Sequence, residues 1–491
     1  RKMRLLILIC LALLCQNAWA FFDLLNLKTR EPVKFRPQSR HDVPNNYITQ
    51  RVDHFNIRDN RTWQMRYLSN DEFFKPGGPI LLYIGGEWTI NSDALLGGQT
   101  YDIAKQHSGY MFYTEHRFYG FSRPFKDTSV ESLKYLNVDQ ALVDLAYFVN
   151  HVKKTIPGLQ NSKVIAIGGS YAGSMAAWFR LKYPHLVDMA LASSAPMVAV
   201  ADFKEYLEVV GTAISSLSGM KCYEIIEKAT QQIRKTFKEF VGAESVAKVF
   251  NLCPQIESDS PLDFGNFFSS ITGPFSGLAQ YNEAGDVEAA CRHLIDESKN
   301  ATEMKGLAQY LIKNHWGSRC INTKFQPVVD YLKNDTWMHQ ASVGGMRQWM
   351  YQVCTEYGYF QTDSGFKQPF GRGAKTLEMM ETLCSYTYGH GFAGNSKDVL
   401  HNGIKRTNIM YGGLEPKLSK VIFTHGTIDP WHAIGILEDL NEDAPAIVVE
   451  GTSHCKDLES ISESDSTKMR AAKLKVQQLI AKWLKEYSIY I

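Results

Sequence analysis

The chain has 491 residues, with 53 lysines and arginines against 51 aspartates and glutamates, and 44% of its residues are hydrophobic. This composition is typical of a globular protein and excludes a disordered, collagen-like or cysteine-scaffold chain. The formal net charge of +2 gives no electrostatic reason to expect a nucleic-acid-binding surface.

The first twenty residues have the pattern of a secretory signal peptide. Three basic residues among the first four precede an apolar run (residues 5–15), and the small-x-small pattern Ala18-Trp19-Ala20 follows. A membrane-anchoring helix is the alternative, but it needs about 20 apolar residues, and this run is about half as long. We therefore expect residues 1–20 to be removed and the rest of the chain to be secreted or lysosomal, without a membrane anchor.

The cysteines and the glycosylation sequons fit this route. Cleavage would leave seven cysteines in an oxidising compartment, where cysteines usually pair, and seven cannot all pair. We expect three disulfides among six clustered cysteines, in a pairing that the sequence alone does not choose, and a lone Cys455. The six are Cys222, Cys253, Cys291, Cys320, Cys354 and Cys384, and the sequons begin at Asn60, Asn300 and Asn334.

From residue 79 to 198 short apolar runs alternate with amphipathic stretches, which is typical of strands joined by crossover helices. Residues 138–154 carry apolar side chains at helical spacing and predict a helix that covers a mostly parallel sheet. The predicted strands are Pro79–Gly85, Tyr110–Glu115, Val164–Gly168 and Met189–Ser193.

The alternation stops between residues 199 and 411, where helical periodicity and all six clustered cysteines occur without a convincing apolar strand. Strands return at Lys420–Thr424 and Ala446–Glu450, with a helix expected between them at Ile434–Leu440. Residues 472–487 form a helical apolar stripe that we expect to pack on the sheet, the alternative being a partner-binding or membrane-surface helix. We therefore expect core segments 21–198 and 412–491 around a helical insertion, residues 199–411.

The third predicted strand runs into Gly168-Gly169-Ser170-Tyr171-Ala172-Gly173 and then into a helical pattern. A strand, a tight turn carrying serine and a helix form the nucleophile elbow, in which the strained turn exposes the hydroxyl. The last glycine of the usual G-x-S-x-G pattern is Ala172 here, which is still small but makes the motif less specific.

A serine hydroxyl becomes a nucleophile when a base takes its proton and an acid orients that base. Asp429 follows the strand at 420–424, and His454 follows the strand at 446–450. The order Ser170, Asp429, His454 is that of α/β-hydrolases. The alternatives are a turn-forming Asp-Pro pair and a surface histidine.

Acyl transfer also needs backbone donors for the developing oxyanion. We expect these to be the N–H of Tyr171 and the loop around Gly86, although a glycine turn without catalytic importance is the alternative for Gly86. Cys455 beside His454 suggests a second nucleophile, but it lacks an elbow, so a buried free thiol is preferred. Glu115-His116-Arg117 could form another acid-base group, and a structural ion pair is the preferred interpretation.

At these residues the chain resembles the serine peptidase family that contains lysosomal Pro-Xaa carboxypeptidase, dipeptidyl peptidase II and thymus-specific serine protease. The resemblance spans most of the chain beyond the signal peptide. The motifs that carry it are Gln50-Arg51-Val52-Asp53-His54-Phe55, Glu115-His116-Arg117-Phe118-Tyr119-Gly120, Tyr135-Leu136, Asp139-Gln140-Ala141-Leu142, the elbow, Cys354-Thr355-Glu356, Asp429-Pro430-Trp431 and Gly451-Thr452-Ser453-His454-Cys455.

The resemblance implies an α/β-hydrolase core with a helical cap, the triad Ser170, Asp429 and His454, and cleavage of peptides after proline or small residues. It also places Trp431 in the pocket for the residue before the scissile bond, with a core tryptophan as the alternative. Gly86-Glu87-Trp88, Phe121 and Ser174 depart from the carboxypeptidase pattern and place the chain nearer the thymus-specific branch.

We therefore predict a serine peptidase that acts on short peptides and needs neither metal nor cofactor. A secreted esterase or lipase and a catalytically silent binding protein are the alternatives. The sequence leaves open whether the enzyme is a carboxypeptidase, a dipeptidyl peptidase or an endopeptidase, and whether it forms a homodimer. An acidic pH optimum would require the pKa of His454 to lie well below about 6.5.

Overall fold

The computed structural model describes residues 29–486, apart from residues 255, 258, 318 and 390–395. The expected signal peptide, residues 1–20, lies outside the described residues, as does Tyr487 at the end of the expected C-terminal helix. The described chain forms two compact units. The first comprises residues 29–199, 335–357 and 399–486, and the second comprises residues 200–334 and 358–398.

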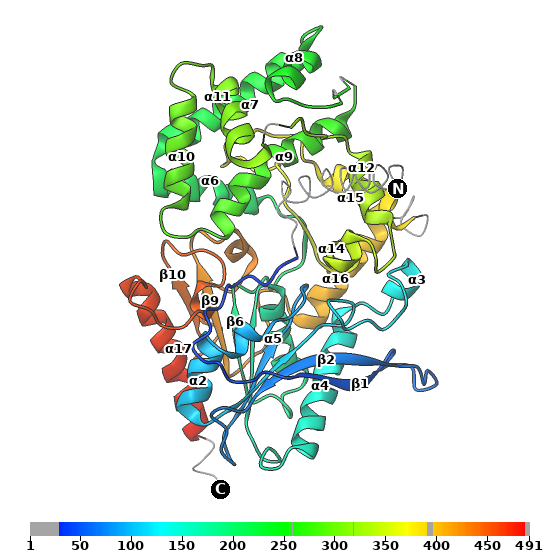
Figure 1. The fold of residues 1–491 in the computed structure, drawn as a ribbon, viewed down its shortest axis with the longest axis vertical. Helices are drawn as coiled ribbons and strands as arrows, with labels where there is room; N and C mark the ends of the chain where they lie inside the picture. Colours follow the sequence, from blue (N-terminus) through cyan, green and yellow to red (C-terminus); the bar gives the residue numbers. More distant parts are fainter. Residues whose placement is uncertain (1–28, 255, 258, 318, 390–395, 487–491) are drawn as a thin grey trace, which may run out of the picture. The chain divides into compact units, whose positions relative to one another are not determined.

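A sheet of eight strands forms the centre of the first unit (Figure 1). Its order is β1-β2-β4-β3-β5-β6-β9-β10, and all neighbours from β4 to β10 are parallel, whereas β1 and β2 are antiparallel. The strands are β1 (Asn45–Arg51), β2 (Thr62–Asn70), β3 (Ile80–Ile84), β4 (Tyr110–Thr114), β5 (Val164–Gly169), β6 (Met189–Ser193), β9 (Val421–Gly426) and β10 (Ala446–Val449).

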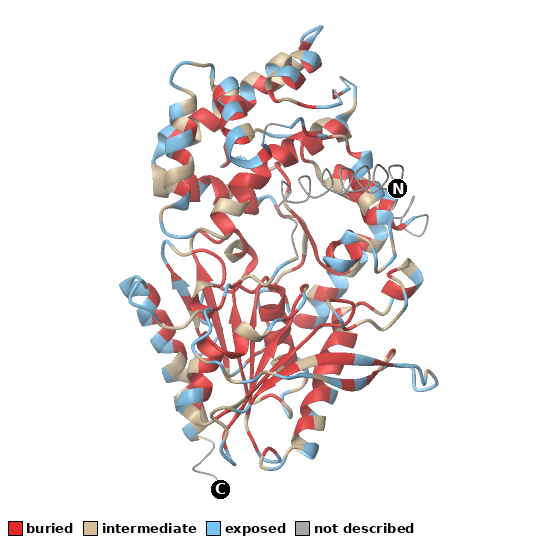
Figure 2. Ribbon diagram, viewed as in Figure 1, coloured by how far each residue is buried: buried red, intermediate tan, exposed pale blue. Residues whose placement is uncertain are grey.

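The six strands predicted from apolar runs are β3, β4, β5, β6, β9 and β10. Every residue of β3, β5, β6 and β9 is buried (Figure 2). Continuous apolar runs are typical of parallel strands that are covered on both faces, which is why these runs could be recognised. The antiparallel pair β1 and β2 was not predicted, because their outer positions are polar and exposed.

The main helices of the first unit are α2 (Gln99–His107), α4 (Val138–Thr155), α5 (Tyr171–Lys182), most of α16 (Ser396–Tyr411) and α17 (Thr467–Glu486). The side chain of Asn137 caps α4 by accepting a hydrogen bond from the N–H of Gln140, and the apolar stripe of α4 is buried. α17 packs against β6, β10 and α2, so the expectation that this helix packs on the sheet is confirmed.

The helix predicted at Ile434–Leu440 is absent, and this prediction was wrong. A 3₁₀-helix (Pro430–Ile434) ends there, and Gly435 is extended. The carbonyl oxygen of Ile434 accepts hydrogen bonds from the N–H groups of Met197 and Val198, so it does not bond to a residue one turn further along. Ile434 and Ile436 bury their apolar side chains although Ile436 lies in a loop, so an apolar run need not mark a helix here.

The first unit also contains several short helices near the carboxyl ends of its strands. They are the 3₁₀-helices Ser92–Leu95 and Lys456–Leu458, the α-helices α3 (Val130–Leu133), α13 (Gln340–Val343) and α14 (Met346–Gln352), and the π-helix η3 (Val353–Tyr357).

The second unit is mainly helical. It also contains a parallel pair of three-residue strands, β7 (Val200–Asp202) and β8 (Gly358–Phe360), which the sequence did not suggest because β7 is neither long nor apolar. The helices are α6 (Glu205–Ser218), α7 (Met220–Phe237), α8 (Gly242–Val249), α9 (Pro261–Gln280), α10 (Asp286–Glu297), α11 (Glu303–Leu311), the π-helix Ile312–Trp316, α12 (Gln326–Lys333) and α15 (Leu377–Tyr388).

Two disulfides have both of their cysteines in the second unit. Cys222 of α7 is bonded to Cys291 of α10, and Cys253 is bonded to Cys320. Cys354 and Cys384 are disulfide-bonded as well, so all six clustered cysteines are oxidised. The expected fold class, an α/β-hydrolase core with a large inserted, mainly helical and disulfide-bonded domain, is confirmed.

Candidate active site

Ser170 occupies a strained turn between β5 and α5. Its φ of 59° and ψ of −133° are unusual for a residue with a side chain, at a cost of about 1–3 kcal/mol. The turn depends on glycines, because a Cβ on Gly168 would lie 2.1 Å from the carbonyl oxygen of Ala172. A Cβ on Gly173 would lie 2.7 Å from the carbonyl oxygen of Ser193. This is the strand-turn-helix geometry of a nucleophile elbow.

Three strands of one parallel block carry the predicted site residues at their carboxyl ends. β5, β6, β9 and β10 lie side by side, Ser170 follows β5, Asp429 follows β9, and His454 follows β10. The N–H of Ser170 donates to the carbonyl oxygen of Ser193 at 2.9 Å. The N–H of Cys455, the residue after His454, donates to Ser194 Oγ at 2.9 Å. The serine turn and the histidine loop are therefore both tied to the end of β6.

Asp429 and His454 form a fully buried pair. His454 Nδ1 lies 2.9 Å from Asp429 Oδ2, and Asp429 Oδ1 accepts the N–H of Trp431 at 3.0 Å. Burial alone would lower the pKa of His454, but the carboxylate of Asp429 outweighs it and raises this pKa well above the ordinary value. Burial alone would raise the pKa of Asp429. The charge of His454 and the hydrogen bonds that Asp429 accepts outweigh this effect and hold the pKa of Asp429 below its ordinary value.

The loop after β3 brings a carboxyl group to this edge of the sheet. Gly86 lies against the ring of Trp88, since a Cβ there would approach that ring to 2.5 Å. Burial raises the pKa of Glu87 to about 7, and the charge of His454 acts to lower it. Glu87 Oε2 is buried without a hydrogen-bond partner among the described residues. Sequence reasoning recognised the paired glycines but did not assign a role to Glu87, although an acidic residue in such a loop is the signal that was available.

Tyr171 begins α5, and its buried side chain is the centre of a hydrogen-bonded cluster. Its hydroxyl lies 3.1 Å from His116 Nε2, accepts from Gln352 Nε2 at 3.0 Å and contacts the hydroxyl of Tyr357 at 3.2 Å. The Gln352 amide is itself fixed by the hydroxyl of Tyr119, which donates to Gln352 Oε1 at 2.7 Å. The residue directly after Ser170 is thus held by side chains from two distant parts of the chain.

Trp431 and Cys455 flank the Asp429–His454 pair. The ring of Trp431 lies 6.5 Å from that of His454, centroid to centroid. Cys455 is buried and is the free cysteine among the described residues. Its Sγ lies 3.8 Å from the carbonyl oxygen of Ser193, and a Cβ on Gly169 would approach it to 2.9 Å. The thiol therefore packs tightly between the serine turn and the histidine loop.

Glu115 and Arg117 form structural ion pairs, and the structural interpretation of this motif is confirmed. Glu115 Oε1 accepts from Arg66 Nη1 at 3.1 Å, and Glu115 Oε2 accepts from Ser122 Oγ at 3.0 Å. Arg117 donates to both carboxylate oxygens of Asp144, at 2.6 and 2.8 Å. The charged groups of the motif are thus fully engaged inside the first unit.

The described part of the chain contains neither a metal-binding cluster nor a membrane-spanning helix. No group of three histidine, cysteine, aspartate or glutamate side chains is placed to hold a metal ion there. Within the same residues, no helix is both long and apolar enough to cross a membrane.

Comparison with known proteins identifies the family. The family described as serine carboxypeptidase S28 matches residues 50–476. The thymus-specific serine protease of Mus musculus is 32% identical over 459 residues, which cover 90% of this chain and 87% of that protein. Lysosomal Pro-X carboxypeptidase of Bos taurus is 30% identical over 468 residues, which cover 90% of this chain and 88% of that protein. The chain therefore belongs to the serine carboxypeptidase S28 family and is a serine-type peptidase.

Proposed function

We propose that Ser170, His454 and Asp429 are the nucleophile, the general base and the orienting acid of this peptidase. The observation that carries the proposal is the buried contact of 2.9 Å between Asp429 Oδ2 and His454 Nδ1. It fixes the histidine so that Nδ1 bears a proton and Nε2 is the basic nitrogen. The strained turn at Ser170, on the same edge of the sheet, supplies the hydroxyl.

The reaction then proceeds through an acyl-enzyme. Ser170 Oγ attacks the carbonyl carbon of the scissile peptide bond while its proton passes to His454 Nε2. The tetrahedral intermediate collapses as His454 gives this proton to the leaving amine. A water molecule, deprotonated by His454, then attacks the acyl-enzyme ester and releases the acid product and Ser170. Asp429 stabilises the imidazolium in both halves of the reaction.

The oxyanion of each tetrahedral intermediate needs backbone donors. The N–H of Tyr171 is one donor in this proposal, because it begins α5 directly after the nucleophile. The loop at Gly86 supplies the second. The Tyr171 hydroxyl cluster supports this role, because it fixes the residue whose N–H must be positioned.

For the substrate we propose short peptides cleaved after proline or small residues, with Trp431 lining the pocket before the scissile bond. Its support is the name of the Pro-X carboxypeptidase relative and the place of the Trp431 ring beside His454. Family membership favours this peptidase function over the esterase, lipase and silent-scaffold alternatives.

We also propose a secreted or lysosomal location. Disulfide-bonded cysteines are typical of proteins that fold in an oxidising compartment. The three sequon asparagines Asn60, Asn300 and Asn334 are all exposed, as glycosylation in that compartment requires.

The experiment that tests the mechanism is Ser170→Ala. The variant should lose turnover of a mixed peptide library while its thermal unfolding stays close to that of the wild type. Products should be identified by mass spectrometry, whose termini also separate carboxypeptidase, dipeptidyl peptidase and endopeptidase action. Wild-type rates of cleavage by a folded Ser170→Ala protein would refute the assignment of the nucleophile.

A further inference from the structure

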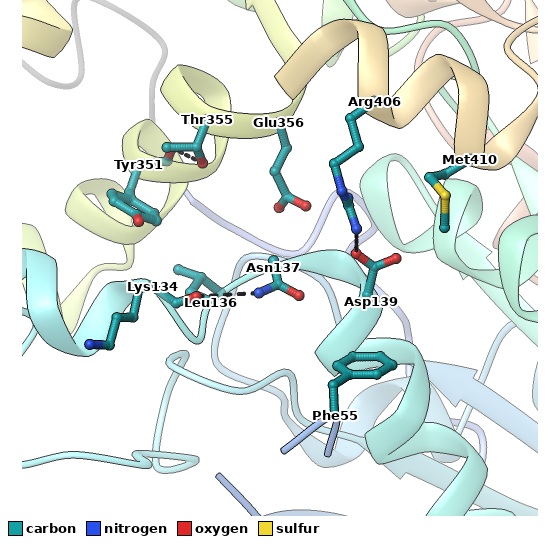
Figure 3. Close-up of a pocket in the computed structure, with 10 residues that line it drawn as sticks. All are labelled: Phe55, Lys134, Leu136, Asn137, Asp139, Tyr351, Thr355, Glu356, Arg406 and Met410. Carbon is teal, nitrogen blue, oxygen red and sulfur yellow. Dashed lines mark hydrogen bonds and ion pairs between the residues drawn. The ribbon is translucent and has the colours of Figure 1, made fainter. Parts of the chain in front are cut away.

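A cavity of about 450 Å³ in the first unit is lined by none of the residues assigned to catalysis above (Figure 3). It lies between the start of α4, the segment formed by α14 and η3, and helix α16. Its lining residues are Phe55, Lys134, Leu136, Asn137, Asp139, Tyr351, Thr355, Glu356, Arg406 and Met410.

Glu356 contributes a buried carboxyl group to the lining of this cavity, and only one of its two oxygens is hydrogen-bonded within the described residues. The residue is 5% exposed. Its Oε1 accepts the N–H of Val138, the first residue of α4, at 3.1 Å. Its Oε2 is buried and has no hydrogen-bond partner among the described residues. A buried acceptor without a donor costs free energy that a ligand carrying N–H groups would recover.

The other charged residues of the lining are already paired. Arg406 forms an ion pair with Asp139, and Asp139 also accepts a hydrogen bond from the hydroxyl of Tyr411 at 2.6 Å. Lys134 Nζ lies 2.8 Å from Oε2 of Glu131, outside the cavity. Among the charged residues of the lining, Glu356 is therefore the one without an ion-pair partner in the described part of the chain. A ligand that complements its carboxylate would be a cation.

The protonation of Glu356 decides when such a cation can bind. Burial raises the pKa of Glu356 to about 7, the N–H of Val138, the charge of Arg406 and the side-chain amide of Gln352 lower it, and Asp139 raises it. The charged and titratable groups that act on it or respond to it are Asp139, Arg406, Tyr171, Tyr351 and Tyr411. The pKa of each of these three tyrosines is raised further above 10, so the tyrosines stay neutral between about pH 5 and 8.

We propose that this cavity binds the ammonium group of a small primary amine with an apolar body, with Glu356 Oε2 accepting its hydrogen bond. Phe55 and Tyr351 contribute aromatic rings to the lining, and the face of an aromatic ring attracts a cation. Leu136 and Met410 provide apolar surface for the rest of the ligand. Because Glu356 must be ionised to balance the ammonium charge, binding releases its proton, and the affinity rises with pH.

Three probes of nearly equal shape test this proposal: 3-methylbutylamine, 3-methylbutan-1-ol and 3-methylbutanoate. Their binding to the whole protein should be measured by calorimetry at about pH 5.5 and about pH 8. With a pKa of about 7, the ionised fraction of Glu356 rises about 30-fold over this interval, so the affinity for the amine should rise about 30-fold. The alcohol and the carboxylate should bind much more weakly than the amine at pH 8. Tighter binding of the carboxylate, or no binding of the amine, would overturn the proposal.

Glu356→Gln supplies the residue-level test, with Glu131→Gln as its matched control. Both remove one carboxylate from the same region, but Glu131 is exposed and lies outside the cavity. Glu356→Gln should weaken amine binding at least tenfold at pH 8 and abolish its pH dependence, whereas Glu131→Gln should preserve both. Unchanged amine binding in a folded Glu356→Gln protein would refute the site. If that variant does not fold, the three probes on the wild type decide the question.

Discussion

Asp429→Asn is the sharpest test of the proposed triad, because the structure sets its magnitude. Asp429 Oδ2 and His454 Nδ1 are 2.9 Å apart, and both side chains are fully buried. Opposite unit charges about 4 Å apart at an effective dielectric constant of about 20 attract by about 4 kcal/mol. This attraction stabilises the imidazolium of the transition state. At about 1.4 kcal/mol per tenfold in rate, its loss should lower kcat about 10³-fold.

The assay is kcat on a peptide that the wild type cleaves, together with the thermal unfolding of each protein. Asparagine keeps the size of the side chain and can still accept the N–H of Trp431. Asp457→Asn is the matched control, since Asp457 is a second buried carboxyl group at this edge that bonds to Ser193 and Thr424 instead of His454. It should leave kcat close to that of the wild type. A folded Asp429→Asn enzyme within tenfold of the wild-type kcat would refute the role of Asp429.

Two further predictions use other contacts of the first unit. Asp429 raises the pKa of His454, so the base is protonated at acidic pH. As the pH is lowered, kcat/KM should therefore decrease with a midpoint above about pH 6.5. A midpoint well below about pH 6.5 would contradict the pairing. Asp144→Asn should lower the free energy of unfolding by about 3–5 kcal/mol, because it leaves the buried Arg117 guanidinium without its counter-charge; equal urea midpoints for variant and wild type would contradict this.

The sequence predicted the residues at the strand ends because their signals are local. Ser170 sits in a turn whose glycines are adjacent to it, and Asp429 and His454 directly follow strands that read as buried apolar runs. Parallel strands end at one edge of a sheet, so local patterns sufficed to bring these residues together. Their roles are still proposals, but their placement needed no long-range information.

The same reasoning failed where the outcome depends on pairing between distant segments. Residues 434–440 have an apolar pattern, yet the carbonyl oxygen of Ile434 bonds to Met197 and Val198. The Tyr171 cluster joins residues more than 180 positions apart through Gln352 and Tyr357. The cavity around Glu356 is likewise formed by segments that lie far apart in the sequence. Hydrophobic periodicity cannot predict which polar atoms of such segments will be in contact.

Buried titratable groups give this protein opposing dependences of stability on pH. Burial raises the pKa of three glutamates to about 7, and it lowers the pKa of three histidines to about 4. The glutamates are Glu31, Glu87 and Glu356, and the histidines are His116, His315 and His425. Between pH 4.5 and 6.5 each glutamate holds a proton in the folded state that it loses on unfolding, so the stability it contributes at low pH is lost as the pH rises.

Each histidine is neutral in the folded state and takes up a proton on unfolding in that window, so its contribution grows as the pH rises. The two sets act in opposite directions on the dependence of stability on pH; burial also raises the pKa of Asp102, Glu115 and Asp457, which act with the glutamates, and lowers that of His107 and His339, which act with the histidines. Glu87→Gln removes one group that loses a proton on unfolding, so the slope of stability against pH in this window should exceed that of the wild type by about 1.4 kcal/mol per pH unit. Thermal unfolding at several pH values measures this slope for the wild type and for the variant. Equal slopes in the variant and the wild type would contradict the raised pKa of Glu87 in the folded protein.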